Sequence, residues 1–241
     1  MNLPAIRQQL HTLLDERQPA DAIESYYAFH HPDNRTQITL LPAGETRPQG
    51  YITLSQTGFD LFRPMITWRL PITDLEQSTA FIYQGLTPGM PVILLTPAHY
   101  LPLVRTWFDI EREELLHLLV LDRGRYEPII NVLVTEAQSG NEWPRYIVRA
   151  PNGTVAASAL LNWQSRYFAE IAVHTQASYR GRGWGRSVVA TLCQYVLDRG
   201  RTPLYAVNPD NAPSLNLAER VGFVDTGLRH MIVEATLRPR S

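Results

Sequence analysis

Three glycines and three arginines alternate in the segment Arg180-Gly181-Arg182-Gly183-Trp184-Gly185-Arg186. A strand-like run ends near Val173, just before this segment, and a strongly helical pattern follows it. Glycines let the backbone approach a ligand closely and adopt positive φ. Free N–H groups at a helix N-terminus attract anions, and guanidinium groups pair well with phosphate oxygens. The segment therefore predicts a diphosphate-binding turn.

Residue types and spacing exclude the common nucleotide-binding motifs. A dinucleotide fingerprint would need glycine where Arg186 stands, and a P-loop would need a lysine, a residue that this sequence lacks. Arginine–glycine tracts that bind RNA are longer and disordered. From the residues of the turn alone, one alternative stays open, namely a tight strand-to-helix connection whose glycines serve only its geometry.

A second block lies downstream, where Asn208-Pro209-Asp210-Asn211-Ala212-Pro213-Ser214 leads into Leu217-Ala218-Glu219-Arg220-Val221-Gly222-Phe223. The turn matches the R-x-x-G-x-G signature of the GNAT acyltransferase superfamily, and this block resembles its Asn–helix–Gly-Phe motif. A strand is expected before each motif, as in the superfamily. Residues 145–235 therefore resemble a GNAT domain.

The resemblance implies that acetyl-CoA binds where two neighbouring parallel strands, about 167–174 and 203–207, splay apart. It also implies that the pyrophosphate binds backbone amides of the turn and that the pantetheine arm pairs with the first strand. The second motif is then expected beside that arm. The coenzyme-binding residues implied are Ile171, Val173, Arg180, Gly181, Arg182, Gly183, Trp184, Gly185, Arg186, Asn211 and Ser214.

Amide formation by direct attack on a thioester needs a base for the ammonium group and an acid for the thiolate. Glu170 is the first candidate base because it lies on the strand expected to line the wedge, although it could instead be a surface carboxylate paired with an arginine. His174 is the second candidate. Many superfamily members carry a tyrosine acid where this sequence has Ala218. Tyr205 is therefore the candidate acid, with solvent or no acid as alternatives.

The expected elements place the chain in the α+β (α/β) class, with a mixed, mostly antiparallel sheet flanked by helices. Residues 1–122 run helix, helix, three strands, helix, strand, helix, strand, an order that resembles the GNAT fold. The join Arg69–Asp74, which corresponds to the glycine turn, contains no glycine. We therefore expect two GNAT-like domains in tandem, a degenerate one over 1–122 and a catalytic one over 123–241. An unrelated α/β domain is the alternative for 1–122.

Composition limits the partners and the compartment. The formal net charge of -1 gives no long-range attraction to nucleic acid or to an anionic membrane. The single cysteine, Cys193, excludes a cysteine cluster for zinc and lies on a buried helical stripe, so no metal site is expected. No apolar run approaches the ~20 residues needed to span a bilayer, and the N-terminus lacks a signal-peptide profile. These features predict a cytoplasmic protein.

The leading hypothesis is an acyl-CoA-dependent N-acetyltransferase that moves an acetyl group from acetyl-CoA to a primary amine on a small molecule or peptide. No nucleic-acid or membrane partner is expected. Two alternatives stay open. One is a non-catalytic module that binds acyl-CoA, and the other is an enzyme that uses a longer acyl-CoA.

Overall fold

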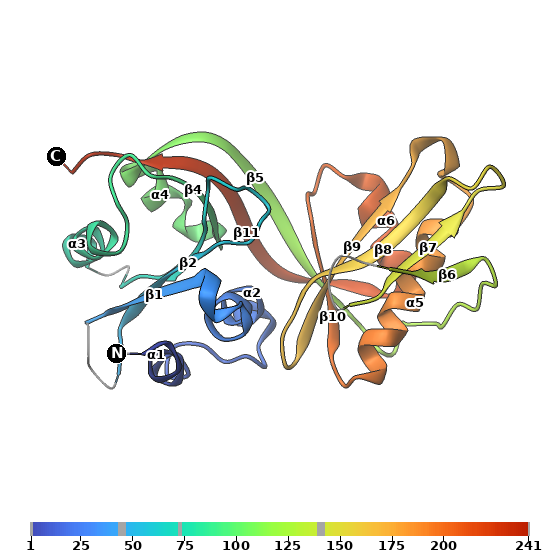
Figure 1. Ribbon diagram of the computed structural model, residues 1–241, viewed down its shortest axis with the longest axis horizontal. Helices are drawn as coiled ribbons and strands as arrows, with labels where there is room; N and C mark the ends of the chain where they lie inside the picture. Colours follow the sequence, from blue (N-terminus) through green and yellow to red (C-terminus); the bar gives the residue numbers. More distant parts are fainter. Residues whose placement is uncertain (1, 43–46, 72–73, 139–142, 241) are drawn as a thin grey trace. The chain divides into compact units, whose positions relative to one another are not determined.

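The computed structural model describes residues 2–42, 47–71, 74–138 and 143–240. The chain divides into two compact units, Met1–Leu116 with Arg229–Ser241 and His117–Leu228 (Figure 1). The predicted division at 122/123 followed the sequence alone, whereas this division falls after Leu116 and assigns residues 229–237, the end of the chain's last strand, to the first unit. Where the functional domains begin and end stays a prediction.

The first unit contains a mostly antiparallel sheet with helices on both faces. Strands β1 to β3 form a meander, β3 pairs in parallel with β4, and the end of β11 pairs antiparallel with β4. Alternation along β2 places Tyr51 against the N-terminal helices and Ile52 against α3 and α4. The elements are α1 (Leu3–Leu10), α2 (Ala22–Ser25), β1 (Thr36–Leu41), β2 (Gly50–Ser55), β3 (Met65–Arg69), α3 (Leu75–Gly85), β4 (Pro91–Pro97), α4 (Leu101–Trp107) and β5 (Phe108–Leu121).

The second unit contains strands β6 to β10, with α5 and α6 packed on the sheet (Figure 1). Neighbouring strands are antiparallel except for β9 and β10, which are parallel, and the end of β5 pairs antiparallel with β10. The elements are β6 (Val134–Ala137), β7 (Arg145–Arg149), β8 (Val155–Gln164), β9 (Phe168–Thr175), α5 (Trp184–Asp198), β10 (Thr202–Val207), α6 (Ala212–Val221) and β11 (Phe223–Leu237).

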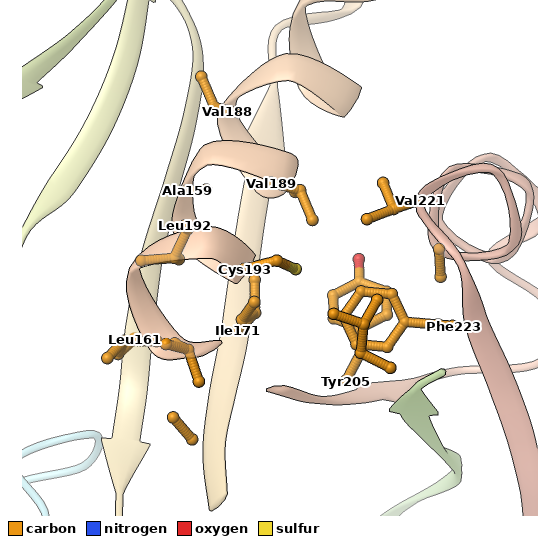
Figure 2. Packing of buried hydrophobic residues seen from close by; sticks show 14 of the residues in the cluster. Ala159, Leu161, Ile171, Val188, Val189, Leu192, Cys193, Tyr205, Val221 and Phe223 are labelled. Carbon is orange, nitrogen blue, oxygen red and sulfur yellow. The ribbon is translucent and has the colours of Figure 1, made fainter. Parts of the chain in front are cut away.

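The core of the second unit forms between α5, α6 and one face of the sheet. Val188, Val189, Leu192 and Cys193 project from α5 into this core (Figure 2). Cys193 is fully buried, and burial raises the pKa of its thiol well above the usual value. A buried, protonated thiol is a poor nucleophile. The prediction that Cys193 is a core residue is confirmed.

The fold class is confirmed. The first helix ends at Leu10. Strand β6 begins only at Val134, because the side chain of Asn131 forms a local turn just before it by accepting a hydrogen bond from the backbone of Leu133. Within the glycine-free join of the first unit, Ile72 and Thr73 lie outside the described residues.

Among the described ranges, no helix is long and apolar enough to cross a membrane.

Candidate active site

A gap opens between β9 and β10 in the second unit. The two parallel strands pair over only three residue pairs, from Phe168–Thr202 to Glu170–Leu204. Both strands continue beyond this point, to Thr175 and Val207, and no pairing joins them in these described residues. We call this gap the β9–β10 wedge. It lies where the sequence predicted that two parallel strands would splay apart.

The glycine turn carries the chain from the end of β9 into α5. Gly181 and Gly183 have φ of 77° and 76°, a left-handed conformation that glycine adopts without a Cβ penalty. Gly183 is the N-cap residue of α5 and has no side chain to bond the first-turn N–H groups. These groups, with the helix dipole behind them, are therefore available to an anion.

Gly185 is fixed by packing rather than by its backbone angles. A Cβ atom there would lie 2.7 Å from Oγ1 of Thr175 and 2.9 Å from Cδ1 of Leu217. The start of α5 therefore approaches both the end of β9 and the middle of α6 at a distance that only glycine permits. The three glycines of the turn thus have two different roles.

A pocket of about 360 Å³ lies over the turn, the end of β9 and one face of α6. Four arginines line it, Arg180, Arg182, Arg186 and Arg220, and no acidic side chain does so in the part of the chain that the structure describes. The lining residues are Val173, His174, Thr175, Tyr179, Arg180, Gly181, Arg182, Gly183, Trp184, Gly185, Arg186, Asn211, Pro213, Ser214, Asn216, Leu217 and Arg220.

This pocket brings together most of the residues that the sequence analysis expected at a coenzyme site. Ile171, Glu170 and Tyr205 are outside its lining. The sequence analysis did not select Thr175, Tyr179, Pro213, Asn216, Leu217 or Arg220. Four of these lie on α6 at positions 213, 216, 217 and 220, and this spacing, typical of one helix face, is a signal that could have found them.

Aromatic rings hold one of the arginines in place. The guanidinium carbon of Arg182 lies 5.5 Å from the ring centre of Tyr179 and 5.2 Å from that of Trp184. Cation–π contacts at these distances orient the guanidinium group without neutralising its charge. Arg182 thus keeps its hydrogen-bond donors for an anion.

Asn211 and Ser214 are placed by the start of α6. The Asn211 side chain caps the helix by accepting a hydrogen bond from the Ser214 backbone N–H, at 3.2 Å. The Ser214 side chain is hydrogen-bonded to Tyr205 on β10. This contact places the Tyr205 hydroxyl group against α6, on the helix-covered side of the sheet.

Tyr205 is almost completely buried beside Phe223, with ring centres 5.8 Å apart (Figure 2). Burial raises the pKa of its hydroxyl above the usual value, while the hydrogen bond to Ser214 acts in the opposite direction. The hydroxyl therefore stays protonated at neutral pH. A protonated hydroxyl can donate a proton to a leaving group that comes within reach.

Glu170 lies at the narrow end of the wedge, in the last pair that joins β9 to β10. Its Oε1 accepts a hydrogen bond of 3.1 Å from the Asn162 side chain. Alternation along β9 puts Glu170 and His174 on the face opposite to Ile171, which packs in the core against α5. Tyr205 and Glu170 thus approach the wedge from opposite faces of the sheet. His174 also lines the pocket and is exposed.

Comparisons with known proteins agree with this geometry. Residues 106–223 match the model of the acetyltransferase (GNAT) family. No curated protein matches the sequence.

Solved structures with similar folds cover either the whole chain or most of it. A Drosophila protein has a TM-score of 0.68 at 11% identity, covering 99% of this chain and 96% of its own. A tandem GNAT protein from the clavulanic acid biosynthesis pathway has a TM-score of 0.60 at 11% identity, covering 99% of this chain and 94% of its own. A GCN5-related N-acetyltransferase from Kribbella flavida has a TM-score of 0.54 at 15% identity, covering 77% of this chain and 86% of its own. At these identities the likeness shows the fold alone.

The fold and the site define an α+β protein with a wedge between parallel strands and an anion-binding turn beside it. With the family match, the chain is identified as carrying a GNAT acetyltransferase domain at residues 106–223. The tandem neighbour, which covers nearly the whole chain, extends the likeness in fold to the first unit.

Proposed function

We propose that this protein transfers an acetyl group from acetyl-CoA to a primary amine by direct attack on the thioester. One observation carries the proposal: the β9–β10 wedge opens beside the uncapped, arginine-rich N-terminus of α5. The diphosphate of the coenzyme would bind the first-turn N–H groups and Arg182. The pantetheine arm would then extend along β9 near Val173 and Ile171, pairing with backbone groups that β10 leaves free.

The amine would approach from the face of the sheet that carries Glu170. Glu170, directly or through a water molecule, would take one proton from the ammonium group and pass it to solvent. The free amine then forms the C–N bond with the thioester carbon, and the C–S bond breaks. The second proton of the amine is lost as the amide forms, and one proton is delivered to the departing thiolate. His174, further along the same face, is the alternative base.

Tyr205 is the proposed donor to the thiolate. Its hydroxyl bonds Ser214, which lies four residues before Ala218 and therefore on the same face of α6. Ala218 stands where the sequence resemblance would place a tyrosine acid, and it is fully buried. A hydroxyl supplied by β10 thus lies near the position that α6 leaves without one.

Calorimetric titration with acetyl-CoA tests the coenzyme assignment. Arg182→Glu should weaken binding at least ten-fold, because a carboxylate would face the phosphates. Arg199→Glu is the control with the same charge change, since Arg199 stacks on Tyr195 at the other end of α5. Absence of wild-type binding at tens of micromolar (on the order of ordinary KM values) would refute the proposal.

Amine-dependent release of free thiol tests the chemistry. Once an acceptor is found in a panel of small amines and peptides, Glu170→Gln should lower kcat/KM by about 100-fold or more. Tyr205→Phe should lower kcat while leaving acetyl-CoA affinity unchanged. An unchanged kcat/KM in Glu170→Gln would reject Glu170 as the base and direct attention to His174.

A second candidate is a non-catalytic module that binds acyl-CoA. The observation that favours it is Ala218, which replaces the tyrosine that many superfamily members use as acid. Tight coenzyme binding without thiol release across the whole panel would support this candidate. A longer acyl group as donor is tested in the same assay by replacing acetyl-CoA with a fatty or aromatic acyl-CoA.

A further inference from the structure

The pocket carries more positive charge than a diphosphate requires. Arg180, Arg182, Arg186 and Arg220 all line it. Within the described ranges of the chain, no carboxylate forms an ion pair with any of the four, and Nε of Arg186 is buried without a hydrogen-bond partner. A diphosphate diester carries about two negative charges, which the helix N-terminus and the turn arginines already match.

Arg220 is separate from the other three. It lies in the last turn of α6, whereas the other three lie in the glycine turn and the first turn of α5. Leu217, one turn before Arg220, lies against Gly185 at the start of α5. Arg220 is therefore about 4.5 Å further along the α6 axis than the point where the two helices meet. Its side chain lines the same pocket, from an element away from the glycine turn's own arginines in sequence.

We propose that Arg220 binds the 3′-phosphate of the coenzyme and makes the site selective for the complete CoA nucleotide. This inference rests on the proposed function, since it assumes that the ligand is an acyl-CoA. A phosphate monoester carries about 1.5 to 2 negative charges at neutral pH. The diphosphate and the 3′-phosphate together carry about four, which equals the number of unpaired arginines in the pocket.

The number of negative charges on the ligand also distinguishes two classes of acyl donor. A phosphopantetheine arm attached to a carrier protein has a single phosphodiester and no nucleotide, so it would leave Arg220 and part of the turn without an anion. Free CoA thioesters use all four arginines. The pocket therefore fits a soluble CoA thioester rather than a carrier-bound acyl group.

The test is a calorimetric titration of three ligands, CoA, dephospho-CoA and 4′-phosphopantetheine, into four proteins. The proteins are the wild type, Arg220→Gln, Arg182→Gln and, as a matched control outside the pocket, Arg199→Gln. Wild type should bind CoA about ten-fold more tightly than dephospho-CoA, as one charge-assisted contact in a partly exposed site provides. Arg220→Gln should remove this preference by weakening CoA alone. Arg182→Gln should weaken CoA and dephospho-CoA equally, and Arg199→Gln should match wild type.

Each other outcome refutes a distinct statement. If wild type binds CoA and dephospho-CoA equally, or if Arg220→Gln keeps the preference, the assignment of the 3′-phosphate to Arg220 is wrong while the proposed function stands. If Arg220→Gln weakens both ligands equally, Arg220 contacts the diphosphate instead. If wild type binds neither nucleotide, the proposed function and this inference are both wrong.

Discussion

At the scale of single residues, Gly185 provides the sharpest test of the turn. Gly185→Ala should destabilise the protein by about 1 to 3 kcal/mol, the usual cost of overpacking, and should weaken acetyl-CoA binding, because the new Cβ would push α5 away from Thr175 and Leu217. Gly200→Ala is the control. Unlike Gly185 it has a positive φ, at 71°, and nothing lies within 4 Å of its Cβ position. It should cost about 1 kcal/mol of backbone strain and leave binding unchanged, as urea unfolding and calorimetry would show.

The residues of the turn could be predicted from sequence because their roles are local. Gly181 and Gly183 need positive φ, and Asn211 caps the helix that follows it within three residues. Thr175, Leu217 and Arg220 were missed, because their roles arise only when α5 and α6 pack together. The hydrogen bond between Tyr205 and Ser214 likewise depends on the packing of β10 against α6.

At the scale of elements, a buried pair joins α2 to β11 in the first unit. Glu24 and His230 are each about 3% exposed at their side chains, and Oε1 lies 3.1 Å from Nε2. His230→Ala should destabilise the first unit by about 2 to 5 kcal/mol, because it removes a buried side chain and leaves Oε1 of Glu24 without its hydrogen-bond partner. Replacing both residues by leucine should be nearly neutral.

An exposed ion pair provides the comparison for the buried pair of Glu24 and His230. Arg105→Ala breaks an ion pair of 2.8 Å to Glu113 at the surface and should cost less than about 1 kcal/mol in the same urea-unfolding measurement. A loss in His230→Ala as small as that in Arg105→Ala would contradict the role assigned to the buried pair.

The helices α5 and α6 were expected from the sequence, the first after the glycine turn and the second within the Asn–helix–Gly-Phe motif. The pairing of strands was harder to predict from the sequence, because β5 and β11 each contribute residues to both compact units. Pairing between strands far apart in the sequence depends on free backbone edges, which leave no periodic pattern in either strand. The division into 1–122 and 123–241 was drawn without this pairing and stays a prediction.

At the scale of the whole molecule, both units contain a pair of parallel strands that diverge. In the first unit, β3 and β4 pair only at Met65–Ile93 and Ile66–Leu94. Beyond these two pairs, a side-chain hydrogen bond joins the two strands, because Nε1 of Trp68 on β3 donates to Oγ1 of Thr96 on β4 at 2.9 Å. The Tyr100 hydroxyl also accepts a hydrogen bond from the backbone of Leu70 at 3.3 Å.

The helix that follows β3 is closed to anions as well. The Asp74 carboxylate caps α3 by accepting a hydrogen bond of 2.8 Å from the backbone N–H of Gln77. A carboxylate at this position occupies one of the first-turn donors and repels a phosphate. The corresponding position in the second unit is Gly183, which has no side chain. These differences favour the expectation of a degenerate N-terminal domain over residues 1–122, which stays a prediction.

We therefore expect one molecule of acetyl-CoA per chain, measured as the calorimetric stoichiometry. Trp68→Ala should change neither the stoichiometry nor the affinity, since the Asp74 cap would still exclude the diphosphate. Arg182→Glu should weaken this single binding event, because it acts at the turn of the second unit. A stoichiometry of two, or a second binding event of undiminished affinity in Arg182→Glu, would show that the first unit binds the coenzyme despite its bridged strands. One site in the wild type, weakened by Arg182→Glu and unaffected by Trp68→Ala, would assign acetyl-CoA binding to the second unit alone.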